Sequence, residues 1–152
     1  MEVFRLSRQA FSGTLSGKGA ALKGARWNSA GVEVVYAASN RSLAMAEVAV
    51  HLSFTWLPTD YQMLTIYVPP GTSITTVPLA ELPRDWNVFP HRPATQAIGD
   101  AFIAANKFCI LQVPSAVTPG DTNWLMNPYH PEFARIQIIR AEDFRFDNRL
   151  FR

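Results

Sequence analysis

The amino-acid sequence predicts a single α+β domain, with a mixed or antiparallel sheet of about six strands and two or more helices. The first observation is size, because a chain of 152 residues that is 48% hydrophobic can bury most of its unfolded surface in one core. The second is pattern, because short segments rich in β-branched and aromatic residues alternate with segments of helical periodicity. The third is continuity, since no internal repeat or low-complexity segment divides residues 1–152.

The N-terminal region is predicted to contain a strand and a glycine-rich loop. Residues 3–6 are expected to form a short opening strand, and residues 11–25, FSGTLSGKGAALKGA, an irregular loop. The loop does not fit a phosphate-binding P-loop, because three residues rather than four separate Gly13 from Gly17. Gly19 also stands where that pattern needs serine or threonine. These departures argue against a nucleoside-triphosphate site.

A tightly joined strand and helix follow. The segment VEVVYAA predicts a strand over 32–38, and LAMAEVAVHL predicts a helix over 43–52. The side chain of Ser39, Asn40 or Ser42 can cap this helix. The connection is so short that a residue near the end of the strand can lie close to the helix.

The rest of the chain supplies further strands and a second helix. PATQAIGDAFIAA predicts a helix over 93–105 that opens with a proline. The turn-rich segment 115–133 is predicted to be an ordered surface loop, in which side-chain amides close turns. Its polar and aromatic residues Asn123, Trp124, Asn127 and His130 are interpreted as loop structure. The remaining predicted strands are 61–68, 74–79, 108–115 and 133–140.

Composition excludes several classes of protein. The formal net charge of +2 comes from 14 basic and 12 acidic residues spread along the chain, so there is no basic stripe that would predict direct nucleic-acid binding. No apolar run is long enough for a membrane span, and the first residues lack a secretion signal. Cys109 has no partner for an internal disulfide and lies in a predicted strand. A reducing cytoplasm is the expected location.

Glu47 is the residue that points most directly to chemistry. Helical spacing places it on one face with His51 and with Leu43, Val50 and Phe54. A carboxylate on an apolar helix face is costly to bury unless it is paired or used in a reaction. His51 could ligate a metal beside Glu47, but the other histidines are remote in sequence and lack ligand spacing. We therefore expect no metal, and a structural or Glu47-orienting role for His51.

Three other residues each have a structural and a functional interpretation. Arg26, before Trp27 in a loop, could grip a phosphate or pair with a surface carboxylate. Tyr36 could fill the core or stack on a flat heterocycle. Ser115 ends a predicted strand, where binding residues often lie, but no nucleophile-elbow glycines surround it.

Several segments together resemble the RES-domain toxins of bacterial toxin–antitoxin pairs. The segments are GARWNSAGVEVVYAASNRSLAMAEVAVHL, LQVPS, NWLMNPYHPEF and FRFDNRLF, so the resemblance covers nearly the whole chain. The family is named for an arginine, a glutamate and a serine, which correspond here to Arg26, Glu47 and Ser115. Ser29 and Ser42 lie in the matching block and are alternatives for the serine.

The resemblance implies an ADP-ribosyltransferase-like fold and an enzyme that destroys NAD, with water or phosphate as acceptor. It also implies a cognate helix-turn-helix antitoxin that covers the active-site entrance. Glu47 would bind the ribose and stabilise a cationic transition state, and Ser115 would orient the ribose or amide. Arg26 with Trp27, Tyr36 and His51 would contact the dinucleotide, Arg26 at the pyrophosphate and Tyr36 at the nicotinamide.

Alternatives to NAD cleavage remain open at this stage. The same fold could transfer ADP-ribose to a protein or nucleic acid, or the chain could be a non-catalytic module that accepts a partner helix or RNA. Metal-dependent hydrolysis through Glu47 and His51 is a further alternative. A dehydrogenase is excluded, because no G-x-G-x-x-G fingerprint stands between a strand and a helix.

Overall fold

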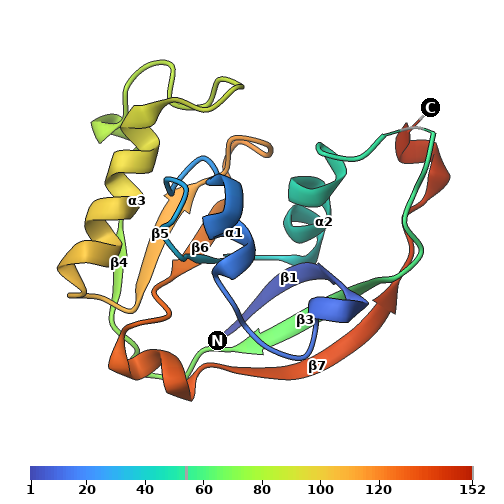
Figure 1. Cartoon of the computed structure of the whole chain (residues 1–152), viewed down its shortest axis with the longest axis horizontal. Coiled ribbons are helices and arrows are strands. Elements are labelled where there is room, and N and C mark those ends of the chain that lie inside the picture. The colour runs from blue at the N-terminus through green and yellow to red at the C-terminus, as the bar shows by residue number, and fades with distance from the viewer. Residues whose placement is uncertain (54, 152) are drawn as a thin grey trace.

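A computed structural model describes residues 1–53 and 55–151, and within these ranges the chain forms a seven-stranded mixed sheet flanked by helices (Figure 1). The strand order is β4-β5-β6-β2-β1-β3-β7, with β4 and β5 parallel and the other neighbours antiparallel. The strands are β1 (Glu2–Arg8), β2 (Val35–Ala38), β3 (Tyr61–Tyr67), β4 (Ile74–Thr76), β5 (Ile110–Pro114), β6 (Thr122–Met126) and β7 (Gln137–Phe144). The α+β class is confirmed.

The helices are short. The α-helices are α1 (Lys18–Lys23), α2 (Arg41–Ala49) and α3 (Pro93–Ala105). The 3₁₀ helices are η1 (Gln9–Phe11), η2 (Leu79–Glu81), η3 (Pro131–Arg135) and η4 (Asn148–Phe151). Across the described ranges, none of these helices has the length and apolarity needed to span a membrane.

Both predicted helices form, but α2 covers Arg41–Ala49 rather than 43–52, so Val50 and His51 lie beyond its last residue. Helix α3 has the predicted bounds, and α2 is capped by Asn40, whose side chain accepts a 2.8 Å hydrogen bond from the Leu43 N–H. The prediction of an irregular loop over 11–25 was wrong in part, since α1 forms within it around the helix-favouring run AALK. Gly17 precedes α1 where a Cβ would come within 2.7 Å of the Val34 nitrogen, which explains the glycine.

The strand β6 was missed, because residues 115–133 were predicted to form a loop. The strand lies between β5 and β2, with four of its five residues buried. A strand covered on both faces lacks the alternation of polar and apolar residues that makes strands visible in a sequence. Consequently Asn123 and Trp124 are strand residues rather than loop residues.

The sheet consists of two halves that meet at one narrow junction. Strands β1 and β2 are paired only at Phe4 and Ala38, whereas β1 and β3 are paired along their whole length. Helix α2 packs on the β1 side through Leu43 and Ala44, and α3 packs on the β5 and β6 side through Phe102. The two helices therefore lie apart over the sheet (Figure 1), and the site described next is lined by α2 and by the segment before α3.

Candidate active site

A cavity of about 650 Å³ lies beside the junction of the two half-sheets. Its lining comes from β1, β2, β6, α2 and the residues after it, the segment before β2, the segment before α3, and the segment after β5. Five of the residues predicted from the sequence line it: Arg26, Trp27, Tyr36, Glu47 and His51. Phe54, predicted on the same helix face, lies outside the described residues.

Glu47 is fixed by two side chains, one from the residue that follows β5 and one from β6. Its Oε1 accepts a hydrogen bond of 2.9 Å from Ser115 Oγ and one of 2.6 Å from Asn123 Nδ2. The carboxylate is partly buried and lines the cavity. Both bonds go to Oε1, and none of the described residues hydrogen-bonds to Oε2. Oε2 therefore remains available to a ligand. A carboxylate held in this way can face a developing positive charge without reorganising.

Ser115 lies behind Glu47 and is 2% exposed. Its hydroxyl donates to Glu47 while accepting hydrogen bonds from the backbone N–H groups of Val117 and Thr118 at 3.1 and 3.0 Å. These two N–H groups orient the hydroxyl, so its hydrogen points at the carboxylate. Of the three serines considered for this position, Ser115 is the one that contacts Glu47. Ser29 bonds to Asp100, and Ser42 is exposed.

Asn123 is a site residue that the sequence reasoning missed. It is 9% exposed, lines the cavity, and lies opposite Ala38 in the pairing of β2 and β6. The one available signal was an asparagine directly before the apolar run WLM, since a buried amide needs a partner. The partner, Glu47, is 76 residues away in the chain.

Arg26 is held by the backbone of the segment before α3. Its Nη1 donates to the carbonyl oxygens of Trp86 and Val88 at 2.8 and 2.9 Å. Burial lowers the pKa of Arg26, and the negative charge of Glu47 opposes that shift. The structural interpretation of Arg26 was an ion pair with a surface carboxylate, and no described carboxylate forms one with it. Its remaining N–H groups can therefore bind an anion in the cavity.

Tyr36 and Trp27 support the segment that carries Arg26. The Tyr36 hydroxyl donates to Asn28 Oδ1 at 2.6 Å and accepts from the Trp27 N–H at 3.2 Å. Burial raises the pKa of Tyr36, so the hydroxyl stays protonated. The Trp27 side chain is 2% exposed and its ring lies 6.0 Å from that of Trp86. Trp27 thus has little surface for a ligand and packs the core beneath Arg26.

Two histidines line the cavity from opposite sides. His51 follows α2 and is exposed, whereas His91 precedes α3 and is partly buried. His91 is remote from Glu47 in sequence, and it reaches the cavity because the segment before α3 lines the site. Burial lowers the pKa of His91, and the positive charges of Arg26 and His51 act in the same direction. The site therefore favours the neutral form of His91.

Arg5 is a second site residue that was missed. It lies on β1, lines the cavity and donates through Nη1 to the backbone carbonyl of Tyr36 at 2.9 Å. Burial lowers its pKa, and it forms no ion pair with the described carboxylates. An arginine within the otherwise apolar VFRL was the available signal. The cavity thus contains two guanidinium groups that form no ion pair with any carboxylate in the described part of the chain.

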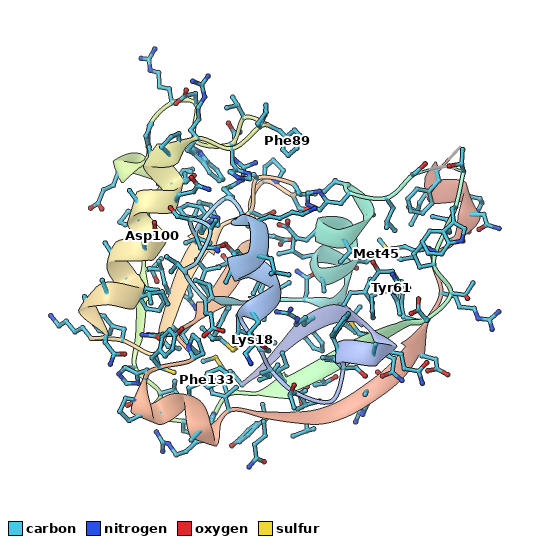
Figure 2. The ribbon with its side chains drawn as sticks, in the orientation of Figure 1. Lys18, Met45, Tyr61, Phe89, Asp100 and Phe133 are labelled. Atoms are coloured by element: carbon cyan, nitrogen blue, oxygen red, sulfur yellow. The ribbon has the colours of Figure 1, made fainter. Side chains whose placement is uncertain are left out.

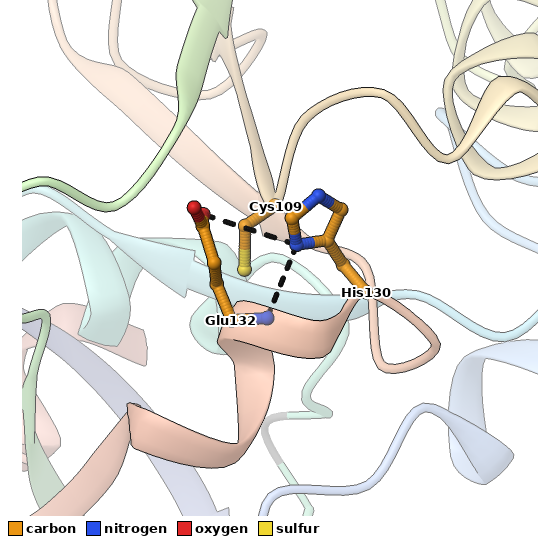
Figure 3. A group of neighbouring side chains, drawn as sticks. All are labelled: Cys109, His130 and Glu132. Carbon is orange, nitrogen blue, oxygen red and sulfur yellow. Dashed lines mark hydrogen bonds and ion pairs between the residues drawn. The ribbon is translucent and has the colours of Figure 1, made fainter.

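A separate cluster contains Cys109, His130 and Glu132, whose potential ligand atoms lie within 4.8 Å of one another (Figure 3). Glu132 Oε2 accepts hydrogen bonds from the N–H and hydroxyl of Ser73, and His130 Nδ1 accepts from the Glu132 N–H. Burial raises the pKa of Cys109 to about 11. The contacts within this cluster tie η3 to the segment before β4, and the cluster includes neither Glu47 nor His51.

Comparison with known proteins matches residues 2–147 to the RES domain. A protein of Pseudomonas putida named Toxin Res is 39% identical, over 99% of this chain and 100% of its own length. The Prs ADP-ribosylating toxin of a Sphingobium species is 36% identical, over 91% of this chain and 87% of its own. The toxin–antitoxin complex MbcT–MbcA of M. tuberculosis contains a chain with a similar fold, at a TM-score of 0.72 and 22% identity, covering 98% of this chain and 85% of that one.

Proposed function

The chain belongs to the RES domain family, and on this premise we propose that it is the toxin of a toxin–antitoxin pair and cleaves the nicotinamide–ribose bond of NAD. The observation that carries the proposal is the carboxylate of Glu47, held by Ser115 and Asn123 at the wall of a cavity. The size of the cavity, about 650 Å³, suits a dinucleotide partly open to solvent.

Glu47 is assigned the role of stabilising positive charge on the sugar. When the bond between C1′ and the pyridinium nitrogen breaks, the electron pair leaves with neutral nicotinamide and C1′ becomes cationic. Oε2 of Glu47 faces that charge or holds the ribose hydroxyls, while Oε1 stays bound to its two donors. The oxygen of water or phosphate then bonds to C1′, and with water a proton is released. Electrostatic stabilisation of this kind contributes about a hundredfold or more in rate.

Arg26 and Arg5 are assigned to the pyrophosphate. Both line the cavity, and neither is neutralised by a described carboxylate. A pair of guanidinium groups suits the two negative charges of a dinucleotide, because each group can donate two parallel hydrogen bonds to phosphate oxygens. Arg26 keeps its carbonyl contacts to the segment before α3 while its other N–H groups serve the ligand.

Tyr36 is assigned to the nicotinamide ring and His51 to a ribose hydroxyl or to the orientation of Glu47. The Tyr36 hydroxyl is occupied by Asn28 and Trp27, so only the ring can serve a ligand. Trp27 contributes by supporting Arg26. Ser115 acts through Glu47 and is a positioning residue in this scheme.

The experiment is incubation of the purified chain with NAD, followed by separation of the products. Stoichiometric free nicotinamide together with ADP-ribose would support hydrolysis, and a phosphorylated ADP-ribose formed only when phosphate is added would support phosphorolysis. An unchanged NAD concentration at high protein concentration, with the chain shown to be folded, would contradict the proposal.

A second candidate function is transfer of ADP-ribose to a macromolecule. It is favoured by the relative from Sphingobium, 36% identical, whose name describes it as ADP-ribosylating Prs. Both functions break the same bond in NAD and differ only in the acceptor. If the chain modifies a macromolecule, label from the adenine half of NAD will accumulate on that macromolecule. If the chain degrades NAD, the same label will appear in small products.

An antitoxin partner is proposed on the same premise. The structurally similar chain was solved in a toxin–antitoxin complex, and we expect a cognate helix-turn-helix antitoxin to cover the cavity entrance of this chain. Co-expression of the neighbouring gene product should relieve growth inhibition and slow nicotinamide release. Relief of growth inhibition by a partner that leaves NAD cleavage unchanged would contradict this arrangement.

A further inference from the structure

An exposed aromatic side chain stands at the cavity, outside the residues assigned above. Phe89 is 76% exposed and lines the cavity from the segment that joins η2 to α3. In Figure 2 it projects from the loop before α3, on the side where α2 lies. A phenylalanine with so much exposed surface beside a cavity has an apolar face available for a flat ligand.

Arg26 connects Phe89 to the rest of the site. Its guanidinium donates to the carbonyl of Val88, the residue directly before Phe89, and it is close enough to Glu47 for the two charges to interact. Arg26 therefore lies beside the segment that carries Phe89 and within electrostatic range of Glu47, and all three residues line one cavity. The pyrophosphate of a dinucleotide lies between its nicotinamide ribose and its adenosine, which suits an arginine that interacts both with Glu47 and with the segment of Phe89.

His91 contributes to the same part of the cavity. The rings of Phe89 and His91 lie edge to face, with centroids 6.5 Å apart and an angle of 72° between their planes. This contact restrains the Phe89 ring, which would otherwise rotate freely in solvent. The two rings together offer a face and an edge of the kind that base-binding sites use.

We propose that Phe89, supported by His91, forms the subsite for the purine base of the dinucleotide. The inference rests on the proposed function, because it takes the ribose end of the ligand to lie at Glu47. The base stacks on the phenylalanine face, and the phosphates lie between it and Glu47 on Arg26. The contact is made in the ground state and in the transition state alike, so it lowers KM and leaves kcat unchanged.

The test compares substrates with and without the base. Loss of one aromatic stacking partner weakens binding about tenfold. Phe89→Ala should therefore raise KM for NAD about tenfold, with kcat unchanged and with the cleavage of nicotinamide mononucleotide, which lacks adenosine, unaffected. Phe89→Trp should retain the wild-type KM. The matched control is Phe11→Ala, since Phe11 is 73% exposed and does not line the cavity.

Two outcomes would overturn the inference. The first is an unchanged KM for NAD in Phe89→Ala. The second is an equal rise in KM for NAD and for nicotinamide mononucleotide, which would indicate a structural role. Titration of the wild-type chain with AMP separates this inference from the proposed function. If the chain releases no nicotinamide, the proposed function fails. AMP binding that Phe89→Ala weakens and Phe11→Ala does not would still support a purine subsite, and AMP binding insensitive to Phe89 would overturn it.

Discussion

The hydroxyl of Ser115 donates a hydrogen bond of 2.9 Å to Oε1 of Glu47, across 68 positions of the sequence. This contact joins the end of β5 to helix α2, behind the wall of the cavity that Glu47 lines. The serine is itself oriented by two backbone N–H groups, so the direction in which the Glu47 carboxylate points is set by the backbone that follows β5. The orientation of the Glu47 carboxylate thus depends on a residue that does not line the cavity.

Ser115→Ala tests this positioning role. Removal of the hydroxyl frees Glu47 to rotate and leaves the N–H groups of Val117 and Thr118 without an acceptor. We expect kcat for NAD cleavage to fall about 10- to 100-fold, because small displacements of a catalytic group are costly. The free energy of unfolding should decrease by about 1–2 kcal/mol.

The control for that variant is Ser42→Ala, since Ser42 is exposed on α2. Steady-state kinetics and denaturant unfolding of both variants provide the measurement. Wild-type kcat in Ser115→Ala, together with a loss of stability, would mean that the serine has only a structural role.

Asn123→Asp tests the charge at Glu47. The Asn123 amide donates at 2.6 Å, and an aspartate there would place two carboxylates within reach of one another. The negative charge of each carboxylate disfavours ionisation of the other, so the pKa of one of them rises and it binds a proton more readily. We expect kcat at neutral pH to fall about a hundredfold in Asn123→Asp and less in Asn123→Ala, which removes the bond without adding charge. A pH–rate profile provides the measurement, and wild-type activity in Asn123→Asp would contradict the assigned role of Glu47.

His91 makes stability depend on pH. Its pKa is lowered in the folded state by burial and by Arg26 and His51, so protons bind it more readily in the unfolded state. Its contribution to stability is therefore complete above the ordinary pKa of about 6.5 and is lost as the pH falls below that value. Because His91 is only partly buried, the effect should be small. We expect denaturation midpoints measured from pH 7.5 to 5 to decline less in His91→Gln than in the wild type; an equal decline would exclude His91 as the cause.

The local features of the site could be predicted from the sequence, because they depend on neighbours in the chain. The turn from β2 into α2 places Tyr36 and Glu47 on adjoining elements, and the cap at Asn40 fixes where α2 begins. Helical spacing and the cost of burying a carboxylate were enough to single out Glu47. The α+β class followed from the same periodicities.

The partners of Glu47 could not be predicted, since they depend on the pairing of distant strands. Asn123 reaches Glu47 only because β6 inserts between β5 and β2, and β6 has no alternating pattern. His91 reaches the cavity because its segment is bonded to Arg26, a long-range contact with no local signature. Arg5 was visible as an arginine in an apolar strand, but the junction of the half-sheets that exposes it to the cavity was not.

The central claim is that the carboxylate of Glu47 stabilises the sugar cation formed from NAD. The most direct measurement is the rate of nicotinamide release from NAD by Glu47→Gln, beside Glu81→Gln, which alters an exposed carboxylate away from the cavity. Both variants should remain folded. We predict a loss of about a hundredfold or more in kcat for Glu47→Gln and wild-type turnover for Glu81→Gln, whereas full turnover in Glu47→Gln would contradict the account.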